Sequence, residues 1–183
     1  MDDVVIIGGG IIGTATAYFL TKEGRKVKVI ERDPTYKNAS FPLSLGGFRR
    51  QFFQKENILL GKFAKEFICQ IPNLLKTKKN PNPTASMVPN GYLLMFGPEH
   101  AEEQYRALEN HKACEAGTKN IKGIDLKKIF PYINHEGIET ATYTDDKNEG
   151  WIDPFLFHSA LKSKATELGA EFIKGDVKNI NEI

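Results

Sequence analysis

Apolar positions are grouped in two short runs near the start of the chain, with a helical pattern between them. Residues 4–7 are four apolar β-branched residues, which is typical of a parallel strand buried on both faces. Residues 11–23 follow helical spacing, and Gly24 is placed to end that helix. A second apolar run over 27–30 leads directly into Glu31. The pattern therefore predicts a parallel strand–helix–strand unit that is complete by residue 31.

Beyond this unit the pattern is less regular. Residues 33–54 are rich in glycine and serine and predict a loop. An amphipathic helix is expected over 55–71, and its apolar face would carry Ile58, Leu59, Phe63, Phe67 and Ile71. Residues 80–90 contain three prolines and predict a connector. The other expected elements are strands over 91–96, 138–144, 171–173 and 177–180 and helices over 99–116 and 154–168.

Composition narrows the class of protein. The chain has 183 residues, of which 40% are hydrophobic and 26% charged, as in an ordinary globular protein. Its net charge of +2 and the lack of a basic stripe interleaved with aromatic residues argue against a nucleic-acid partner. The four histidines and two cysteines are not at metal-ligand spacing, so no metal site is expected. The longest apolar run is too short to span a membrane, and we expect a soluble intracellular protein.

Three glycines between the first strand and the first helix carry the chemical signal. They form the pattern Gly8-x-Gly10-x-x-Gly13. Gly8 would permit the tight turn, Gly10 would let a pyrophosphate approach the backbone, and Gly13 would let helix and strand pack closely. The helix then begins at Ile11, followed by Ile12. The free N–H groups of these first residues and the positive end of the helix dipole favour a phosphate. The context predicts a dinucleotide site.

Glu31 closes the second strand 18 residues after Gly13. A carboxylate at this place can accept hydrogen bonds from ribose hydroxyls, and it would repel the 2′-phosphate of NADP. An unrelated α/β protein with a glycine-rich turn is the alternative, but the strands, helix and acid together disfavour it. These residues alone leave FAD and NAD open.

Three segments resemble the D-amino-acid-oxidase-like flavoprotein superfamily, which includes sarcosine oxidase, dimethylglycine dehydrogenase and glycine oxidase. They are residues 4–33, residues 38–52 with the sequence Ser44-Leu45-Gly46-Gly47-Phe48-Arg49-Arg50, and residues 149–154 with 175–177. Within the superfamily, the chain most resembles the FAD-dependent oxidoreductase domain-containing protein 1 group. The resemblance implies an α/β fold: a Rossmann-like FAD-binding domain with part of an antiparallel α+β substrate domain. The implied parts are residues 1–79 and 148–183 for the FAD-binding domain and 80–147 for the partial substrate domain.

The resemblance also implies roles for individual residues. Arg32 would lie beside the adenosine ribose, and the backbone of Val177 would meet the adenine. The segment that contains Ser40, Leu45, Gly46 and Gly47 would line the pyrophosphate and approach the isoalloxazine ring. Arg49 or Arg50 would lie near the flavin or the substrate carboxylate, with a surface charge cluster as the alternative. No histidine lies in residues 40–52 or beside the glycine motif, so the FAD is expected to be non-covalent.

The implied function is oxidation of the C–N bond of an amino acid or an N-methylated amine, similar to sarcosine or dimethylglycine, by hydride transfer to FAD. The expected partners are this small molecule and an electron acceptor, either oxygen or a redox protein. A flavin-containing assembly factor for respiratory complex I is the alternative, and an NAD-linked dehydrogenase is a weaker one. The resemblance places the superfamily's last flavin-binding segment beyond Ile183, so the chain is expected to be truncated. The start Met1-Asp2-Asp3 suits a bacterial cytoplasmic protein, with a mitochondrial one as the alternative.

Overall fold

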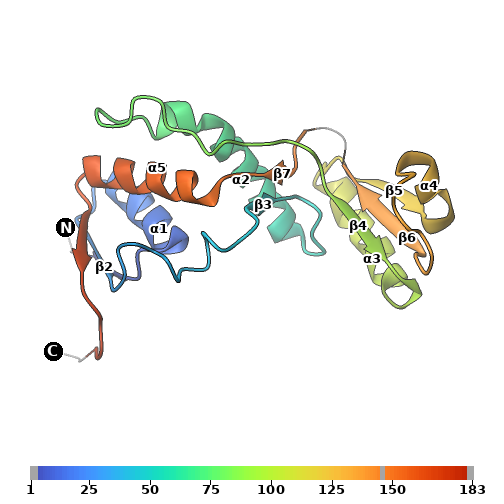
Figure 1. Cartoon of the computed structure of the whole chain (residues 1–183), viewed down its shortest axis with the longest axis horizontal. Coiled ribbons are helices and arrows are strands. Elements are labelled where there is room, and N and C mark those ends of the chain that lie inside the picture. The colour runs from blue at the N-terminus through green and yellow to red at the C-terminus, as the bar shows by residue number, and fades with distance from the viewer. Residues whose placement is uncertain (1–3, 145–146, 181–183) are drawn as a thin grey trace. The chain divides into compact units, whose positions relative to one another are not determined.

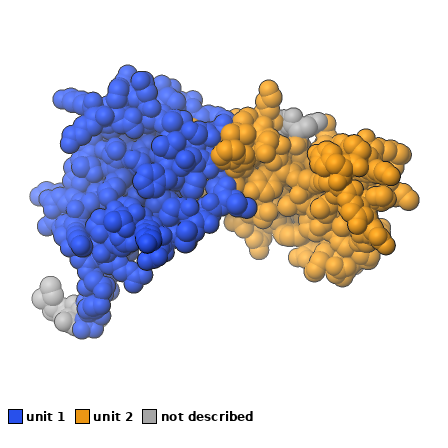
Figure 2. All heavy atoms as spheres, viewed as in Figure 1, with its two compact units in different colours: residues 1–46, 69–87, 152–183 blue, residues 47–68, 88–151 orange. Residues whose placement is uncertain are grey.

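The computed structural model describes residues 4–144 and 147–180, and the chain divides into two compact units. Unit 1 comprises residues Met1–Gly46, Cys69–Met87 and Ile152–Ile183, and unit 2 comprises Gly47–Ile68 and Val88–Trp151 (Figure 2). The chain therefore passes from one unit to the other several times. The domain boundaries expected from the sequence, after residues 79 and 147, stay a prediction.

Unit 1 contains a three-stranded parallel sheet. The strands are β1 (Val4–Ile7), β2 (Val27–Glu31) and β8 (Glu171–Lys174), in the order β1-β2-β8. The crossover helix α1 (Ile11–Lys22) joins β1 to β2, and it packs against α5 (Pro154–Glu167), which precedes β8 (Figure 1). The strand–helix–strand unit predicted from the sequence is thus confirmed.

Burial of β1 differs from the prediction. A strand buried on both faces was expected, but Val5 and Ile7 are each 56% exposed. Val27 and Val29 on β2 are buried and lie beside Val4 and Ile6 in the register, on the face opposite Val5 and Ile7. Within the described residues, the sheet of unit 1 therefore has one covered face and one open face.

Helix α5 begins and ends as its sequence predicts. The Asp153 carboxylate accepts hydrogen bonds from the backbone N–H groups of Phe155 and Leu156, at 2.8 and 2.9 Å, and Pro154 occupies the first helical position. Its other end is followed by Gly169 at a φ of 108°, a conformation that favours glycine. These two signals set the first and last residues of α5.

Unit 2 is built on an antiparallel sheet in the order β4-β6-β5. Its strands are β4 (Leu93–Phe96), β5 (Lys119–Lys122) and β6 (Thr140–Tyr143). A second small sheet pairs β3 (Gly47–Phe48) with β7 (Gly150–Trp151). The helices are α3 (Pro98–Ala113), α4 (Leu126–Ile129), a 3₁₀ turn at Gly123–Asp125, and the first part of α2 (Lys55–Leu74), which continues into unit 1.

Two expectations about elements were wrong, and four short elements were not predicted. Residues 177–180 form no strand, because the ladder to β2 ends with the bond from the Gly175 N–H to the Glu31 carbonyl. The strands β3, β5 and β7 and the helix α4 were not predicted, since each is only two to four residues long. On α2, Ile58 and Ile71 are buried as expected, but Leu59 and Phe63 are 47% and 52% exposed.

The architecture confirms the expected fold class. A parallel Rossmann-like sheet with its crossover helix forms unit 1, and an antiparallel α+β arrangement forms unit 2. Over residues 4–144 and 147–180, no helix is long and apolar enough to cross a membrane.

Candidate functional site

The glycine loop between β1 and α1 leaves its outer side open. Gly8 has a φ of 96°, which favours glycine, and the loop turns there from strand to helix. A Cβ on Gly10 would meet no atom within 4 Å, whereas one on Gly13 would overlap the carbonyl oxygen of Gly8. Gly10 is the N-cap of α1, and no side chain caps the helix there. The N–H groups of the first turn, from Ile11 onward, are thus available to a ligand.

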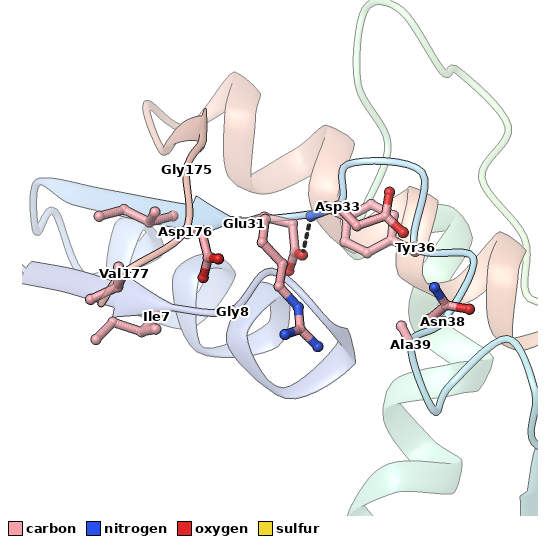
Figure 3. Close-up of a pocket in the computed structure, with 12 residues that line it drawn as sticks. Ile7, Gly8, Glu31, Asp33, Tyr36, Asn38, Ala39, Gly175, Asp176 and Val177 are labelled. Carbon is pink, nitrogen blue, oxygen red and sulfur yellow. Dashed lines mark hydrogen bonds between the residues drawn. The ribbon is translucent and has the colours of Figure 1, made fainter. Parts of the chain in front are cut away.

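The Glu31 carboxylate holds this loop in place through hydrogen bonds. Its Oε2 accepts a hydrogen bond from the Gly9 N–H at 2.7 Å, and its Oε1 accepts one from the Asp33 N–H at 2.8 Å. The two bonds fix the carboxylate at the carboxyl end of β2, beside the glycine loop. Figure 3 shows the bond from the Asp33 N–H. Because each carboxylate oxygen has further lone pairs, Glu31 can still accept hydrogen bonds from ribose hydroxyls.

A cavity of about 740 Å³ lies at the carboxyl ends of β1 and β2. Its lining comes from four segments of unit 1, which supply residues 7–8, residues 30–33, residues 36, 38 and 39, and residues 175–177. Figure 3 shows Asp176 and Val177 on the segment that follows β8, close to the ends of the other two strands. Ligands bind at this edge of parallel α/β sheets, where the loops after the strands converge. The cavity thus brings together Gly8, Glu31, Arg32 and Val177 of the predicted site.

The charges around the cavity are mainly negative. Glu31, Asp33 and Asp176 line it together with one cation, Arg32. The side-chain hydrogen bond from Thr35 lowers the pKa of Asp33, and that from Lys178 lowers the pKa of Asp176, so both carboxylates are ionised near neutral pH. Such a lining suits ribose hydroxyls and disfavours an additional phosphate on the ribose.

The remaining predicted residues do not line this cavity. Ser40 and Leu45 belong to unit 1 but are exposed, Leu45 at 93%. Gly46 and Gly47 have structural reasons to be glycine: a Cβ on Gly46 would overlap the carbonyl oxygen of Ile152, and one on Gly47 would overlap the hydroxyl of Tyr92. Their proposed contacts with the cofactor stay predictions.

The two candidate arginines lie in unit 2. Arg49 places its guanidinium 4.8 Å from the ring centroid of Phe52, a cation–π contact. Arg50 is only 6% exposed, so it does not belong to a surface charge cluster. The buried carboxylate of Glu149 accepts hydrogen bonds from the backbone N–H groups of Arg50 and Gln51 and thereby holds this segment. A role of Arg49 or Arg50 beside flavin or substrate stays a prediction.

Several residues of the site were not found from the sequence. Tyr36, Asn38, Ala39 and Asp176 line the cavity, but no contact with the cofactor was predicted for them. Asn38, Ala39 and Asp176 lie in segments that carry the family resemblance, whereas Tyr36 lies outside them. His158 on α5 is 2% exposed, and its Nε2 lies 2.8 Å from the carbonyl oxygen of Gly9. The only sequence signal for His158 would have been a polar residue on the buried side of an otherwise apolar helix face.

This arrangement fits a dinucleotide cofactor. The loop has open space above Gly10, an uncapped helix start follows it, and a fixed carboxylate stands where a ribose would lie. No group of three or more histidines, cysteines, aspartates or glutamates within the described residues could hold a metal ion. Together, the parallel sheet and this cavity define the class of Rossmann-like dinucleotide-binding proteins.

The comparison with known families is more specific. The model of the family described as FAD dependent oxidoreductase matches residues 3–183. The chain belongs to this family, whose cofactor is FAD. It is 38% identical over 187 residues to FAD-dependent oxidoreductase domain-containing protein 1 of Xenopus laevis, an alignment that covers 98% of this chain and 37% of the relative. The chain thus spans little more than a third of that relative's length, and the resemblance seen in the sequence is confirmed.

Solved structures agree with this assignment. L-proline dehydrogenase from P. horikoshii superposes with a TM-score of 0.76 and 28% identity, over 94% of this chain and 44% of that one. Glycine oxidase from Geobacillus kaustophilus superposes with a TM-score of 0.72 over 94% of this chain and 46% of that one. Its identity of 18% shows the shared fold alone.

Proposed function

We propose that the complete protein oxidises the C–N bond of an amino acid or an N-methylated amine. The observation that carries the substrate class is the likeness to L-proline dehydrogenase, at 28% identity and a TM-score of 0.76. Proline is a secondary amine with a carboxylate, as is sarcosine. Bound FAD would accept a hydride equivalent from the carbon next to nitrogen. A primary or secondary amine would also lose a proton from nitrogen and give an imine, whereas a tertiary amine such as dimethylglycine would give an iminium ion.

The residues of this chain would bind and orient the cofactor. The glycine loop and the start of α1 offer N–H groups to the pyrophosphate, and Glu31 offers carboxylate oxygens to the ribose. Arg32 and the backbone of Val177 line the same cavity, where the adenosine would lie. Arg49 is the candidate for the substrate carboxylate, because a guanidinium binds a carboxylate with two parallel hydrogen bonds.

The proposal is tested with the purified complete protein. A yellow protein whose flavin is released by denaturation is expected, and this result would exclude an NAD-linked dehydrogenase and a covalent flavin. L-Proline, sarcosine, dimethylglycine and glycine are then added one at a time without oxygen, and the flavin band at about 450 nm is followed. Bleaching by at least one of these amines supports the proposal.

A flavoprotein that none of the amines bleaches would contradict the enzymatic proposal and favour the alternative, an assembly factor for respiratory complex I. The electron acceptor is identified in the same preparation. Hydrogen peroxide formed in air with the amine would indicate that oxygen reoxidises the flavin, and reoxidation only by an added redox protein would indicate a dehydrogenase.

A further inference from the structure

The peptide groups on both sides of Gly9 are held by three side chains, two of which are distant in sequence. The Gly9 N–H donates to the Glu31 carboxylate at 2.7 Å. The Gly9 carbonyl lies 2.8 Å from the Thr14 hydroxyl, which donates to it, and 2.8 Å from the His158 Nε2. A carbonyl oxygen can only accept a hydrogen bond, so the His158 Nε2 carries the proton. The Thr14 oxygen, 3.1 Å from the same nitrogen, then accepts from His158.

The His158 side chain is itself held in place by two aromatic rings, those of Phe41 and Tyr36. Its imidazole stacks on Phe41, with ring centroids 4.3 Å apart and an angle of 27° between the rings. Tyr36 meets it edge-on at 4.5 Å, and Tyr36 also lines the cavity. Only 2% of His158 is exposed, so it has no direct access to solvent. The ring therefore joins α5 to the glycine loop and to the loop after β2.

The Gly9 carbonyl determines the direction of the Gly10 N–H. Both groups belong to one planar trans peptide, in which the C=O and N–H bonds point to opposite sides. The Gly9 carbonyl is hydrogen-bonded to Thr14 and His158, and both side chains are buried, so the carbonyl points into the interior of unit 1. The Gly10 N–H must therefore point to the opposite side. Gly10 borders open space, because a Cβ on it would meet no atom within 4 Å.

We infer that His158 is a positioning residue for the cofactor. By holding the Gly9–Gly10 peptide plane, it keeps the Gly10 N–H turned toward the side where the pyrophosphate of FAD is expected. The inference rests on FAD binding at the glycine loop, as in the proposed function. His158 does not touch the reacting atoms, and its effect is on the affinity for FAD.

Two variants of the complete protein separate this role from simple packing. His158→Phe keeps an aromatic ring between Phe41 and Tyr36 but removes the donor, whereas His158→Gln supplies an amide N–H at a similar distance from the backbone. After removal of the flavin, the Kd for FAD is measured by quenching of its fluorescence. The Kd is expected to rise about 10-fold in H158F, and H158Q is expected to stay within about threefold of the wild type.

His111 provides a matched control in unit 2. It is 4% exposed, and its Nε2 also lies 2.8 Å from a backbone carbonyl, that of Phe52. His111→Phe should lower the free energy of unfolding but leave the Kd for FAD unchanged. An equal loss of FAD affinity in H111F and H158F would overturn the inference, because the loss would then reflect general destabilisation.

Thr14→Val covers the case in which H158F does not fold. It is close in shape, removes the second donor to the Gly9 carbonyl, and is expected to raise the Kd for FAD in the same direction. A wild-type Kd in T14V and H158Q together with an unfolded H158F would contradict the inference, as would a wild-type Kd in a folded H158F. If the wild-type protein binds no FAD at all, the proposed function fails instead, so the two failures are distinguishable.

Discussion

Glu149 shows how a single buried charge can hold a segment in place. Its side chain is fully buried, and its two carboxylate oxygens accept four hydrogen bonds. Two come from the backbone N–H groups of Arg50 and Gln51, one from the Gln51 amide and one from the Thr144 hydroxyl. A buried carboxylate is tolerated only when its oxygens are paired in this way. The loop after β3 is therefore tied to the segment before β7.

Glu149→Gln is expected to lower the free energy of unfolding by about 2–4 kcal/mol. In either orientation, the new NH₂ group would face N–H or O–H donors where an oxygen now accepts. Urea denaturation followed by circular dichroism measures the change. Glu136→Gln is the control, since Glu136 is exposed, and a change below about 0.5 kcal/mol is expected there. Equal effects of the two substitutions would show that this hydrogen-bonded cage does not stabilise the fold.

At the scale of elements, two glycines of the Gly8-x-Gly10-x-x-Gly13 motif are required for different reasons. Gly13 is needed for the close approach of α1 to the Gly8 carbonyl, which is a matter of packing. Gly10 meets open space and has a φ of −64°, which any residue can adopt. The stability of the fold and the affinity for the cofactor therefore depend on different glycines of one motif.

Replacing each glycine by alanine tests this separation. Gly13→Ala should lower the free energy of unfolding by about 1–3 kcal/mol, because its Cβ would force α1 away from the loop. Gly10→Ala should leave stability within about 0.5 kcal/mol of the wild type but weaken FAD binding, because its methyl group would occupy the cofactor side of the loop. Thermal unfolding and FAD titration of both variants are the measurements. A G10A protein with unchanged FAD affinity would place the pyrophosphate elsewhere.

The apolar pattern of α2 predicts the helix but not how deeply each apolar side chain is buried. Its apolar positions follow helical spacing, and the helix forms as predicted. The pattern could not indicate that Leu59 and Phe63 stay about half exposed while Ile58 is buried against Cys114 and Ala116. Periodicity defines an apolar face, but the depth of burial depends on which partners the fold brings to that face.

At the scale of the whole molecule, each unit contains one buried histidine whose pKa is lowered. Burial lowers the pKa of His158 in unit 1 and of His111 in unit 2, and hydrogen bonds to backbone carbonyls oppose the shift. Glu31 and Lys162 also act on His158, in opposite directions. In the unfolded chain, both rings take up a proton near pH 6.5. Between that value and the lower folded pKa, the unfolded state binds more protons than the folded one.

Stability is therefore expected to be complete above about pH 6.5 and to fall as the pH decreases below it. Between pH 7.5 and 5.5, stability should therefore fall, by no more than about 1.4 kcal/mol for each histidine, which is the limit set by its unfolded pKa near 6.5. The carboxylates with lowered pKa values, Asp33, Glu167 and Asp176, titrate at lower pH and do not contribute in this window. Urea denaturation at both pH values measures the loss, and the double variant H111Q/H158Q should show a smaller one. An unchanged pH dependence in the double variant would contradict the assignment to these histidines.

The sequence by itself determined the strand–helix–strand unit, the glycine loop and Glu31. These signals lie within the first 31 residues, where strand pairing, the turn at Gly8 and the helix start depend on neighbouring residues. The class of cofactor followed from this unit and from the resemblance carried by the later segments, and the family confirms it.

Only the tertiary structure decided which distant residues complete the site. His158 reaches Gly9 across 149 positions, and the segment at Asp176 and Val177 joins the cavity by following β8 to the edge of β2. It also decided that one face of β1 stays open within the described residues. Such contacts depend on how helices pack and on the order of strands in the sheet, and a local pattern carries neither kind of information.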